Sequence, residues 1–565
     1  MLASEPWLVV LSAVWAALAL ILPTDARTLV DDSWNFALPV QQLLFHGRLY
    51  FDPFNSAAAV IHTLWGALFC LVFGFEPWVL RLSNVAATYL AAVGLYSMVR
   101  WSGRRGDEAF IAALVLSASP VLLVTGFTFQ SDMVYLAMLC WSCALLVRAG
   151  TSGSRKALVW GAVIAALSIW NKLHGLLIAP LALPWFLANR RRLALPWPHL
   201  AMLVVLPLTS YAVFRLGYEW FHPVHTTLDA KWLQVQQRLA QRAPIIRDLA
   251  PRSALLLMHT GIVLLPLIVG LALGPRLERK TPWLWRSVIV GLAAFTAWWL
   301  LRIELDVIES GRYVLEKIET VWPYLPSMLT ELPPLEWPWG FAHATQLALI
   351  GGALLAAMLA SRLAKAIVDY KSPVGMLLLV LVGQLAVLYP LAQFFDRYFI
   401  GPTALLIAIV LIGSRRRLSI FSPGWLLLIP LLVIGGIRST QYLRMHEALW
   451  DQAAVLERRG VDPMQIDAGY GYCGLHNYLP SLEHPDLKRA REEDAWYVKG
   501  LFLAMDVQYV VSWGPANQRY FEIESVSDEP AYDGLGVLDP KHVVVSRRTA
   551  YGPPAEPLNP RLPPE

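Results

Sequence analysis

The sequence predicts a polytopic α-helical membrane protein that ends in a small α/β domain. Apolar residues make up 56% of the 565 residues and charged residues only 15%, well below the roughly 25% that is usual in soluble proteins. Mean hydropathy is +0.49, and runs near the length of about 20 residues that crosses a bilayer recur along the chain. The 24 tryptophans suit belts at a membrane–water interface.

About thirteen apolar segments are long enough, or nearly so, to span a membrane. Several are short, so we expect about 12–13 transmembrane helices. The first is expected to be a retained helix, because its start lacks the basic residues and the cleavage site of a signal peptide. The segments are 7–23, 79–100, 108–126, 132–149, 156–170, 172–188, 198–215, 253–273, 286–302, 341–361, 373–391, 399–413 and 423–438.

Basic residues fall in every second connection between these segments, which the positive-inside rule makes cytoplasmic. They are Arg100, Arg104, Arg105, Arg148, Arg155, Lys156, Arg190–Arg192, Arg276, Arg279, Lys280, Arg362, Lys365, Lys371 and Arg415–Arg417. Counting the apolar run at 57–73 as a further span would invert this pattern. We therefore expect it, like 33–47, to be an interfacial helix in a first outer loop at 24–78.

The chain changes character after residue 438, where polar residues, glycine and proline become frequent. We expect a transmembrane domain at 1–438 and an extracytoplasmic α/β domain at 439–550. That second domain is predicted to have a helix over 441–459 and strands at 507–513, 520–525 and 542–548. Residues 551–565 form a proline-rich tail.

Two cysteines form a Cys-x-x-Cys pair, Cys140 and Cys143, inside an apolar segment. No partner ligands accompany them, so we expect small core residues of a membrane helix rather than a metal or redox site.

The adjacent carboxylates Asp31 and Asp32 follow the first apolar segment. Acidic residues are costly at membrane depth and are usually functional when they border a cavity, so one of them is a candidate general base. The alternative is that they cap the helix that follows.

Three further charged residues fall on the same predicted side of the membrane. Lys172 either acts in the site or extends to the interface from a helix end. Arg397 either binds an anion or pairs with Asp396, and Asp132 either orients reacting groups or caps its helix. His222 and His225 are a weak candidate metal pair, because a third ligand is missing nearby.

Four local sequences resemble the GT-C superfamily of polytopic glycosyltransferases. The likeness is to the bacterial branch related to protein O-mannosyltransferases and the lipid A aminoarabinose transferase. VDDSWNFALPVQQLLFHGRLY places Asp31 where the family has its catalytic acid. FTFQSDMVYLAMLCW holds Asp132, and IWNKLHGLLIAP holds Lys172. QFFDRYFIGP holds Arg397, Tyr398 and Pro402.

This resemblance implies transfer of a sugar from a polyprenyl-phosphate donor to a hydroxyl of a lipid, glycan or protein, outside the cytoplasm. Asp31 would be the general base of an inverting displacement, with Asp32 and Asp132 also in the catalytic group. Lys172, Arg397 and Tyr398 would hold the donor phosphate.

The setting would be the inner (plasma) membrane, with membrane lipids as surroundings and no nucleic-acid partner. A divalent metal ion stays open as a cofactor. Two alternatives also stay open: a transporter or flippase for a lipid-linked glycan, which would need repeats or broken helices, and a non-catalytic scaffold of the cell envelope.

Overall fold

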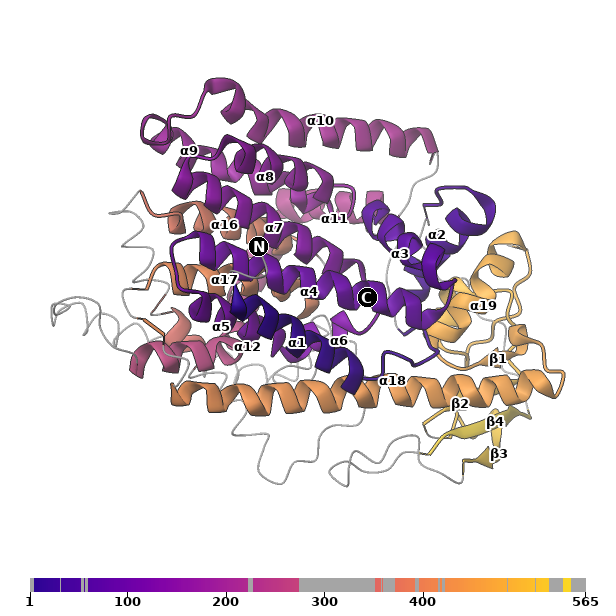
Figure 1. Ribbon diagram of the computed structural model, residues 1–565. Helices are drawn as coiled ribbons and strands as arrows, with labels where there is room; N and C mark the ends of the chain where they lie inside the picture. The colour runs from indigo at the N-terminus through magenta and orange to yellow at the C-terminus, as the bar shows by residue number, and fades with distance from the viewer. Residues whose placement is uncertain are drawn as a thin grey trace.

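The chain forms a helix bundle with a small sheet-containing domain at one end (Figure 1). This computed structural model describes residues 5–30, 32–51, 55, 59–221, 227–273, 351–356, 358, 371–391, 396–414, 417–418, 422–484, 486–513, 515–527 and 542–549. The mostly helical architecture and its apolar helices agree with the predicted membrane fold.

The helices of the first half follow the predicted segments closely. They are α1 (Pro6–Ile21), α2 (Ser33–His46), α3 (Val60–Phe73), α4 (Pro77–Trp101), α5 (Gly106–Ser117), α6 (Pro120–Gly126), α7 (Ser131–Ser152), α8 (Arg155–Ser168), η2 (Leu173–Leu177), α9 (Ile178–Leu193), α10 (Trp197–Phe221), α11 (Thr227–Gln241) and α12 (Ala243–Leu273). The expected interfacial helices at 33–47 and 57–73 correspond to α2 and α3.

The second half contributes α16 (Val374–Leu388), η4 (Asp396–Phe399), α17 (Ile400–Ile412), η5 (Pro423–Leu427) and α18 (Leu428–Arg458). The predicted span at 286–302, about two thirds of the one at 341–361 and the tail at 551–565 lie outside the described residues. Within them, four helices are long and apolar enough to cross a membrane, and five apolar helices are shorter.

The predicted span at 108–126 consists of two helices, α5 and α6, which together are apolar enough to cross a membrane. The chain bends by 73° between α5 and α6. Proline fits the first turn of a helix but lacks the N–H that a helix interior needs, so Pro120 starts a new helix instead of continuing the old one. This bend lets α6 end just before the loop that leads to Asp132.

The helix predicted at 441–459 does not start there. The single helix α18 runs without a break from Leu428 to Arg458, so it crosses residue 438, where the polar composition begins. In Figure 1 it lies along one side of the bundle and reaches the sheet-containing end. This one continuous helix therefore belongs to both parts of the chain.

The C-terminal part contains a four-stranded sheet and two helices, α19 (Tyr470–Glu483) and α20 (Trp496–Leu501). Its strands are β1 (Ile466–Asp467), β2 (Tyr509–Ser512), β3 (Phe521–Val526) and β4 (Val544–Arg548) in the order β1-β2-β4-β3. β1 is parallel to β2, while β4 is antiparallel to both β2 and β3. The three predicted strands are confirmed, and the two-residue β1 was missed.

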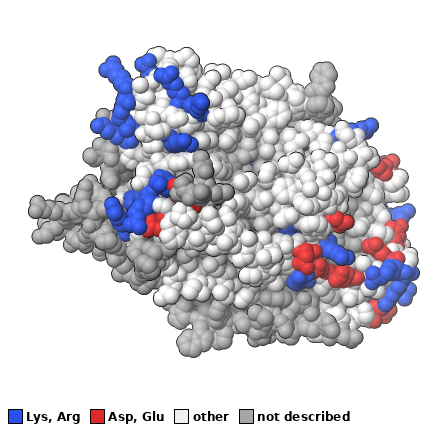
Figure 2. All heavy atoms as spheres, viewed as in Figure 1, with Lys and Arg blue, Asp and Glu red and all other residues white. Residues whose placement is uncertain are grey.

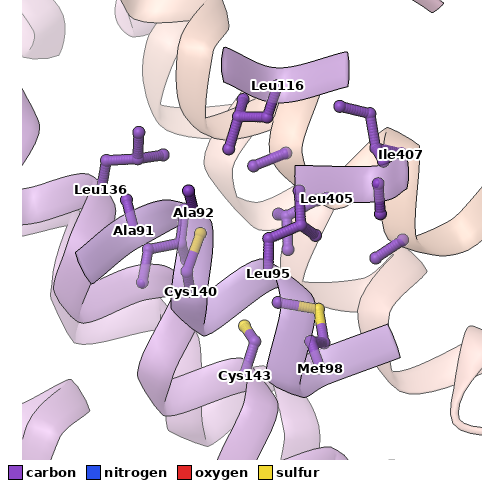
Figure 3. Close-up of a cluster of buried hydrophobic side chains, with 14 of the residues drawn as sticks. Ala91, Ala92, Leu95, Met98, Leu116, Leu136, Cys140, Cys143, Leu405 and Ile407 are labelled. Atoms are coloured by element: carbon purple, nitrogen blue, oxygen red, sulfur yellow. The ribbon is translucent and has the colours of Figure 1, made fainter. Parts of the chain in front are cut away.

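Cys140 and Cys143 are both fully buried. Figure 3 shows their sulfur atoms among apolar side chains of α4, α7 and α17, including Leu95 and Leu405. The expectation of two core residues is therefore confirmed.

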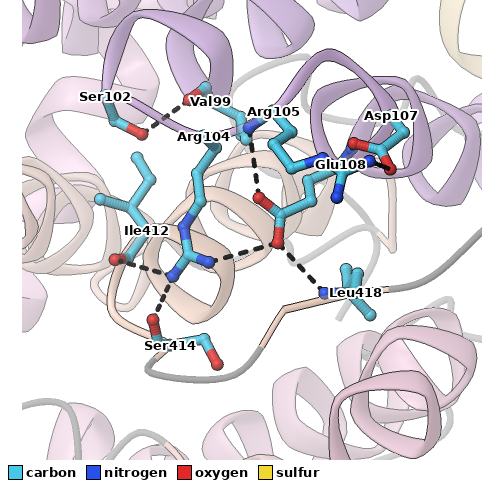
Figure 4. A network of polar contacts seen from close by, with 9 residues as sticks. All are labelled: Val99, Ser102, Arg104, Arg105, Asp107, Glu108, Ile412, Ser414 and Leu418. Carbon is cyan, nitrogen blue, oxygen red and sulfur yellow. Dashed lines mark hydrogen bonds and ion pairs between the residues drawn. The ribbon is translucent and has the colours of Figure 1, made fainter. Parts of the chain in front are cut away.

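A compact polar network surrounds the loop between α4 and α5 (Figure 4). Arg104 contacts Glu108 at 3.3 Å and the carbonyl oxygen of Ser414, and Glu108 accepts from the Leu418 N–H at 3.1 Å. Because Glu108 is 2% exposed, this network ties the start of α5 to the chain after α17. On the face seen in Figure 2, charged side chains gather mainly at the two ends of the molecule, with Lys and Arg prominent at the end away from the sheet.

Candidate active site

Four charged side chains from distant parts of the chain meet at the end of the bundle that contacts the sheet-containing domain. The Lys172 Nζ lies 2.6 Å from Asp132 Oδ1, and the Arg397 Nη2 lies 2.9 Å from Asp32 Oδ2. Arg397 Nε lies 4.0 Å from Asp132 Oδ2 and joins the two pairs. The result is a chain of alternating charges in the order Lys172, Asp132, Arg397, Asp32.

Both acidic residues of this chain sit at helix starts. Asp32 is the residue before α2, and Asp132 is in the first turn of α7, where the positive end of a helix favours a carboxylate. The side chain of Asp32, however, makes no capping hydrogen bond. Asp32 therefore occupies the N-cap position that the sequence alternative predicted, but it lacks the capping hydrogen bond, and its carboxylate contacts Arg397 instead.

The Lys172 side chain is only 12% exposed, as is that of Asp132. Its ammonium group is paired with Asp132, and the alternative of a lysine that extends to the membrane interface stays a prediction. The ring of Tyr398 lies 5.7 Å from Nζ, within the range of a cation–π contact. Tyr398, predicted with the donor-binding group, thus lies beside Lys172.

Three predicted site residues cannot be placed. Asp31, His222 and His225 lie outside the described residues, as does the side chain of Asp396. Among the residues that are described, no group of three His, Cys, Asp or Glu side chains could hold a metal ion. The base, the histidine pair and the Arg397–Asp396 alternative therefore stay predictions.

Asn171 fixes the backbone beside Lys172. Its side-chain amide donates to the Ser131 carbonyl at 2.8 Å, and its Oδ1 accepts from the His62 N–H at 3.2 Å. Its own carbonyl accepts from the Ala59 N–H at 3.1 Å. Three segments, the starts of α3 and α7 and the end of α8, are thereby tied together around Lys172 and Asp132.

Arg81, in α4, holds the segment that leads to the acidic pair. Its guanidinium donates to the carbonyl oxygens of Thr24 at 3.0 Å, Thr28 at 2.8 Å, Phe127 at 2.9 Å and Ala26. The side chain is 2% exposed. Arg81 therefore joins the loop before Asp32 to the loop before Asp132.

Sequence reasoning missed both Arg81 and a tyrosine at the site. An arginine inside an apolar helix is itself a signal of a special role, so Arg81 could have been noticed. Tyr470, from α19, places its hydroxyl 3.5 Å from Asp32 Oδ1. It lies 438 residues from Asp32, in a glycine-rich stretch whose position relative to the membrane domain no sequence pattern indicates.

A sequence model of the family described as dolichyl-phosphate-mannose-protein mannosyltransferase matches residues 59–214. Comparison with curated proteins gave no match.

Several solved structures are similar to the chain at low identity. The oligosaccharyltransferase of Archaeoglobus fulgidus, tethered with an acceptor peptide, is 15% identical with a TM-score of 0.47, over 91% of this chain and 69% of that one. ArnT from Cupriavidus metallidurans, bound to undecaprenyl phosphate, is 12% identical with a TM-score of 0.42, over 98% and 100%.

The Pmt1-Pmt2 protein O-mannosyltransferase complex of S. cerevisiae, bound to the sugar donor, is 15% identical with a TM-score of 0.32. That match covers 39% of this chain and 34% of the yeast chain, so this chain spans only about a third of that relative. The resemblance to the protein O-mannosyltransferases is confirmed by the family match over residues 59–214, the segment that carries Asp132 and Lys172.

Proposed function

We propose that this protein is an integral-membrane glycosyltransferase that moves a sugar from a polyprenyl-phosphate donor to a hydroxyl of a lipid, glycan or protein. The observation that carries the proposal is the charge chain of Lys172, Asp132, Arg397 and Asp32. The two largely buried cations can bind an anionic leaving group. The carboxylates beside them can accept a proton from the attacking hydroxyl. The mannosyltransferase family match over 59–214 supports the same class of reaction.

The proposed sugar transfer is a displacement at the anomeric carbon. The acceptor hydroxyl oxygen attacks the anomeric carbon while its proton passes to the carboxylate of Asp31. The bond between that carbon and the phosphate oxygen breaks, and the lipid phosphate leaves with the electron pair. Attack opposite the leaving group inverts the anomeric configuration. A phosphate monoester is a stable anion, so the step needs cations to hold it rather than an acid to protonate it.

The charge chain also predicts how the donor phosphate enters. Lys172 is paired with Asp132, and Arg397 with Asp32, so their charges are balanced before the donor arrives. A donor phosphate therefore competes with a carboxylate for at least one cation. Because Asp32 is more exposed than Asp132, at 28% against 12%, we propose that the Arg397–Asp32 pair opens first.

The proposed setting is the inner membrane, with residues 1–438 spanning it and 439–550 outside the cytoplasm. Arg81, beside the loop that leads to Asp32, lies near the start of α4, and Arg104 follows the end of that helix. The Arg104 network therefore lies at the opposite end of α4 from the site, which supports this orientation through the positive-inside rule. All four native cysteines are buried, so a cysteine introduced at exposed Asp486 or Arg155 can be labelled selectively. Labelling of Asp486→Cys from outside and of Arg155→Cys from inside is the expected result; the reverse pattern contradicts the proposed orientation.

The test of function is release of polyprenyl phosphate from labelled polyprenyl-phosphate sugars by the purified protein in lipid, with envelope extract as the acceptor source. Wild type should turn over one sugar preferentially, and Asp31→Asn and Lys172→Met should each lose at least about 100-fold, as loss of an acid–base or charge-stabilising group does. Asp25→Asn is the matched control, because Asp25 lies in the same loop with its side chain 74% exposed.

Each alternative predicts a different outcome of this experiment. Movement of intact donor across vesicles without release of polyprenyl phosphate would identify a flippase. Neither release nor movement, with a folded protein, would favour a scaffold.

A further inference from the structure

Two glycines of α19, Gly471 and Gly474, pack against residues 29–34, which we call the acidic segment. A Cβ atom at Gly471 would overlap the carbonyl oxygen of Leu29, and a Cβ at Gly474 would overlap the indole ring of Trp34. Gly471 and Gly474 are three residues apart and so lie on one face of the helix. The close approach needs glycine at both positions, and the two contacts are with the residues on either side of Asp31 and Asp32.

Tyr470 is the first residue of α19, and its side chain contacts the acidic segment. Its ring contacts Trp34 edge to face, with centroids 5.6 Å apart, and it packs against Tyr497 at 5.6 Å. Its hydroxyl reaches Asp32 Oδ1 at 3.5 Å, the outer limit of a hydrogen bond, while Arg397 holds Oδ2 at 2.9 Å. The two oxygens of Asp32 therefore face different parts of the chain.

The turn before α19 is itself fixed. Asp467, at the end of β1, accepts hydrogen bonds from the Gly469 N–H at 3.1 Å and from the Tyr497 hydroxyl at 2.8 Å. Gly469 has a φ of +90°, which favours glycine over residues with a side chain. The sheet thus determines where α19 begins and where Tyr470 points.

We propose that Tyr470 is a positioning residue for Asp32, and that docking of α19 on the acidic segment completes the active site. This inference rests on the proposed glycosyltransferase function. It gives the C-terminal domain a direct part in the reaction: Tyr470 and Arg397 together orient the Asp32 carboxylate. It also explains the glycine spacing in Gly-Tyr-Gly-Tyr-Cys-Gly at 469–474.

The first test is Tyr470→Phe, which removes one hydroxyl and keeps the ring contacts. We expect kcat to fall by about 5- to 10-fold, in line with loss of one hydrogen bond, with the KM for the donor and the melting temperature unchanged. A variant that merely loosened the fold would lower the melting temperature. In a double-mutant cycle, the effect of Tyr470→Phe on kcat should disappear in an Asp32→Asn background, because the hydroxyl acts through that carboxylate.

Gly474→Ala tests the docking separately, because the added methyl group meets the Trp34 ring. We expect a larger loss of kcat than for Tyr470→Phe. Gly217→Ala is the matched control: Gly217 is also in a helix, α10, and a Cβ there meets nothing within 4 Å, so its activity should equal wild type.

Thermal unfolding of Gly474→Ala separates this inference from the proposed function. If wild type turns over no donor, the proposed function is wrong, and the melting temperature of Gly474→Ala still tests the docking of α19: it should fall below that of Gly217→Ala, because the added methyl group meets the Trp34 ring. Equal melting temperatures of these two variants would overturn the docking. Unchanged kcat for Tyr470→Phe in an active enzyme, or an equal fall of kcat in the Asp32→Asn background, would overturn the positioning role.

Discussion

Replacing Lys172 by methionine would leave the Asp132 carboxylate without its partner at 2.6 Å. The Asp132 side chain is 12% exposed, and the remaining cation, Arg397, lies 4.0 Å away. Removing one partner of a buried ion pair typically costs about 3–5 kcal/mol, because the other charge stays buried and uncompensated. Since Arg397 compensates in part, we expect about 3 kcal/mol, or a factor of roughly 100 in the folding equilibrium.

The informative comparison is with the variant in which both charges are replaced. Asp132→Leu alone should cost a similar amount, because it leaves the Lys172 ammonium buried. The double variant Lys172→Met/Asp132→Leu has no orphaned charge at this pair, so its cost should fall below the sum of the single costs by about 2 kcal/mol or more. All three variants should lose transferase activity.

The measurement is reversible unfolding in mixed micelles, followed by tryptophan fluorescence, for wild type and the three variants. Arg459→Met is the control: Arg459 pairs with Glu524 at 3.3 Å, and the side chains are 59% and 29% exposed, so its loss should cost less than about 1 kcal/mol. Single costs that add within about 0.5 kcal/mol would refute a direct coupling between Lys172 and Asp132.

Three further predictions concern other parts of the molecule. Cys140→Ala/Cys143→Ala should keep full activity and lose about 1–3 kcal/mol of stability, measured by turnover and thermal unfolding; loss of activity alone would contradict a packing role. Burial lowers the pKa of His476 below 6.5, so the folded state binds the proton less tightly than the unfolded chain, and stability should be full above pH 6.5 and fall as the pH drops through that value. Melting temperatures between about pH 8 and pH 5 should therefore fall less steeply for His476→Gln than for wild type, and equal slopes would count against this assignment. Arg548→Met should cost about 3–5 kcal/mol, because Arg548 pairs with Glu493 and with Asp494 and all three side chains are at most 1% exposed; a melting temperature equal to wild type would show that these carboxylates are neutral or solvated.

Much of the helical fold was predictable because its signal is local. Apolar runs located α4, α7 and α10. The apolar run at 57–73 is a helix, α3, and its interfacial position, inferred from the basic connections, stays a prediction. Alternating apolar residues likewise located β2, β3 and β4. Two-residue β1 has no such signal, since its pairing with β2 is set by residues some 40 positions away.

The site was predictable only in its residue types. The predicted side of the membrane and the family resemblance grouped Asp132, Lys172 and Arg397 in one site. Neither predicted which acid pairs with which cation. Lys172 contacts Asp132 rather than Asp32 because Asn171 ties its backbone to Ser131 at the start of α7. The contact of Tyr470 with Asp32 could not be predicted. It depends on the long helix α18 and on glycine contacts between segments that are remote in sequence.

The hydrogen bonds of Arg81, which we call the Arg81 clamp, restrict how the loop at residues 24–28 can vary. All four of its acceptors are main-chain carbonyl oxygens, which every amino acid supplies. The clamp therefore recognises the path of the backbone over residues 24–28 and is indifferent to the side chains there. Substitutions in this stretch should be tolerated, whereas inserting or deleting one residue would shift the carbonyls out of register with the guanidinium. The length of this loop, more than its composition, determines the position of Asp32.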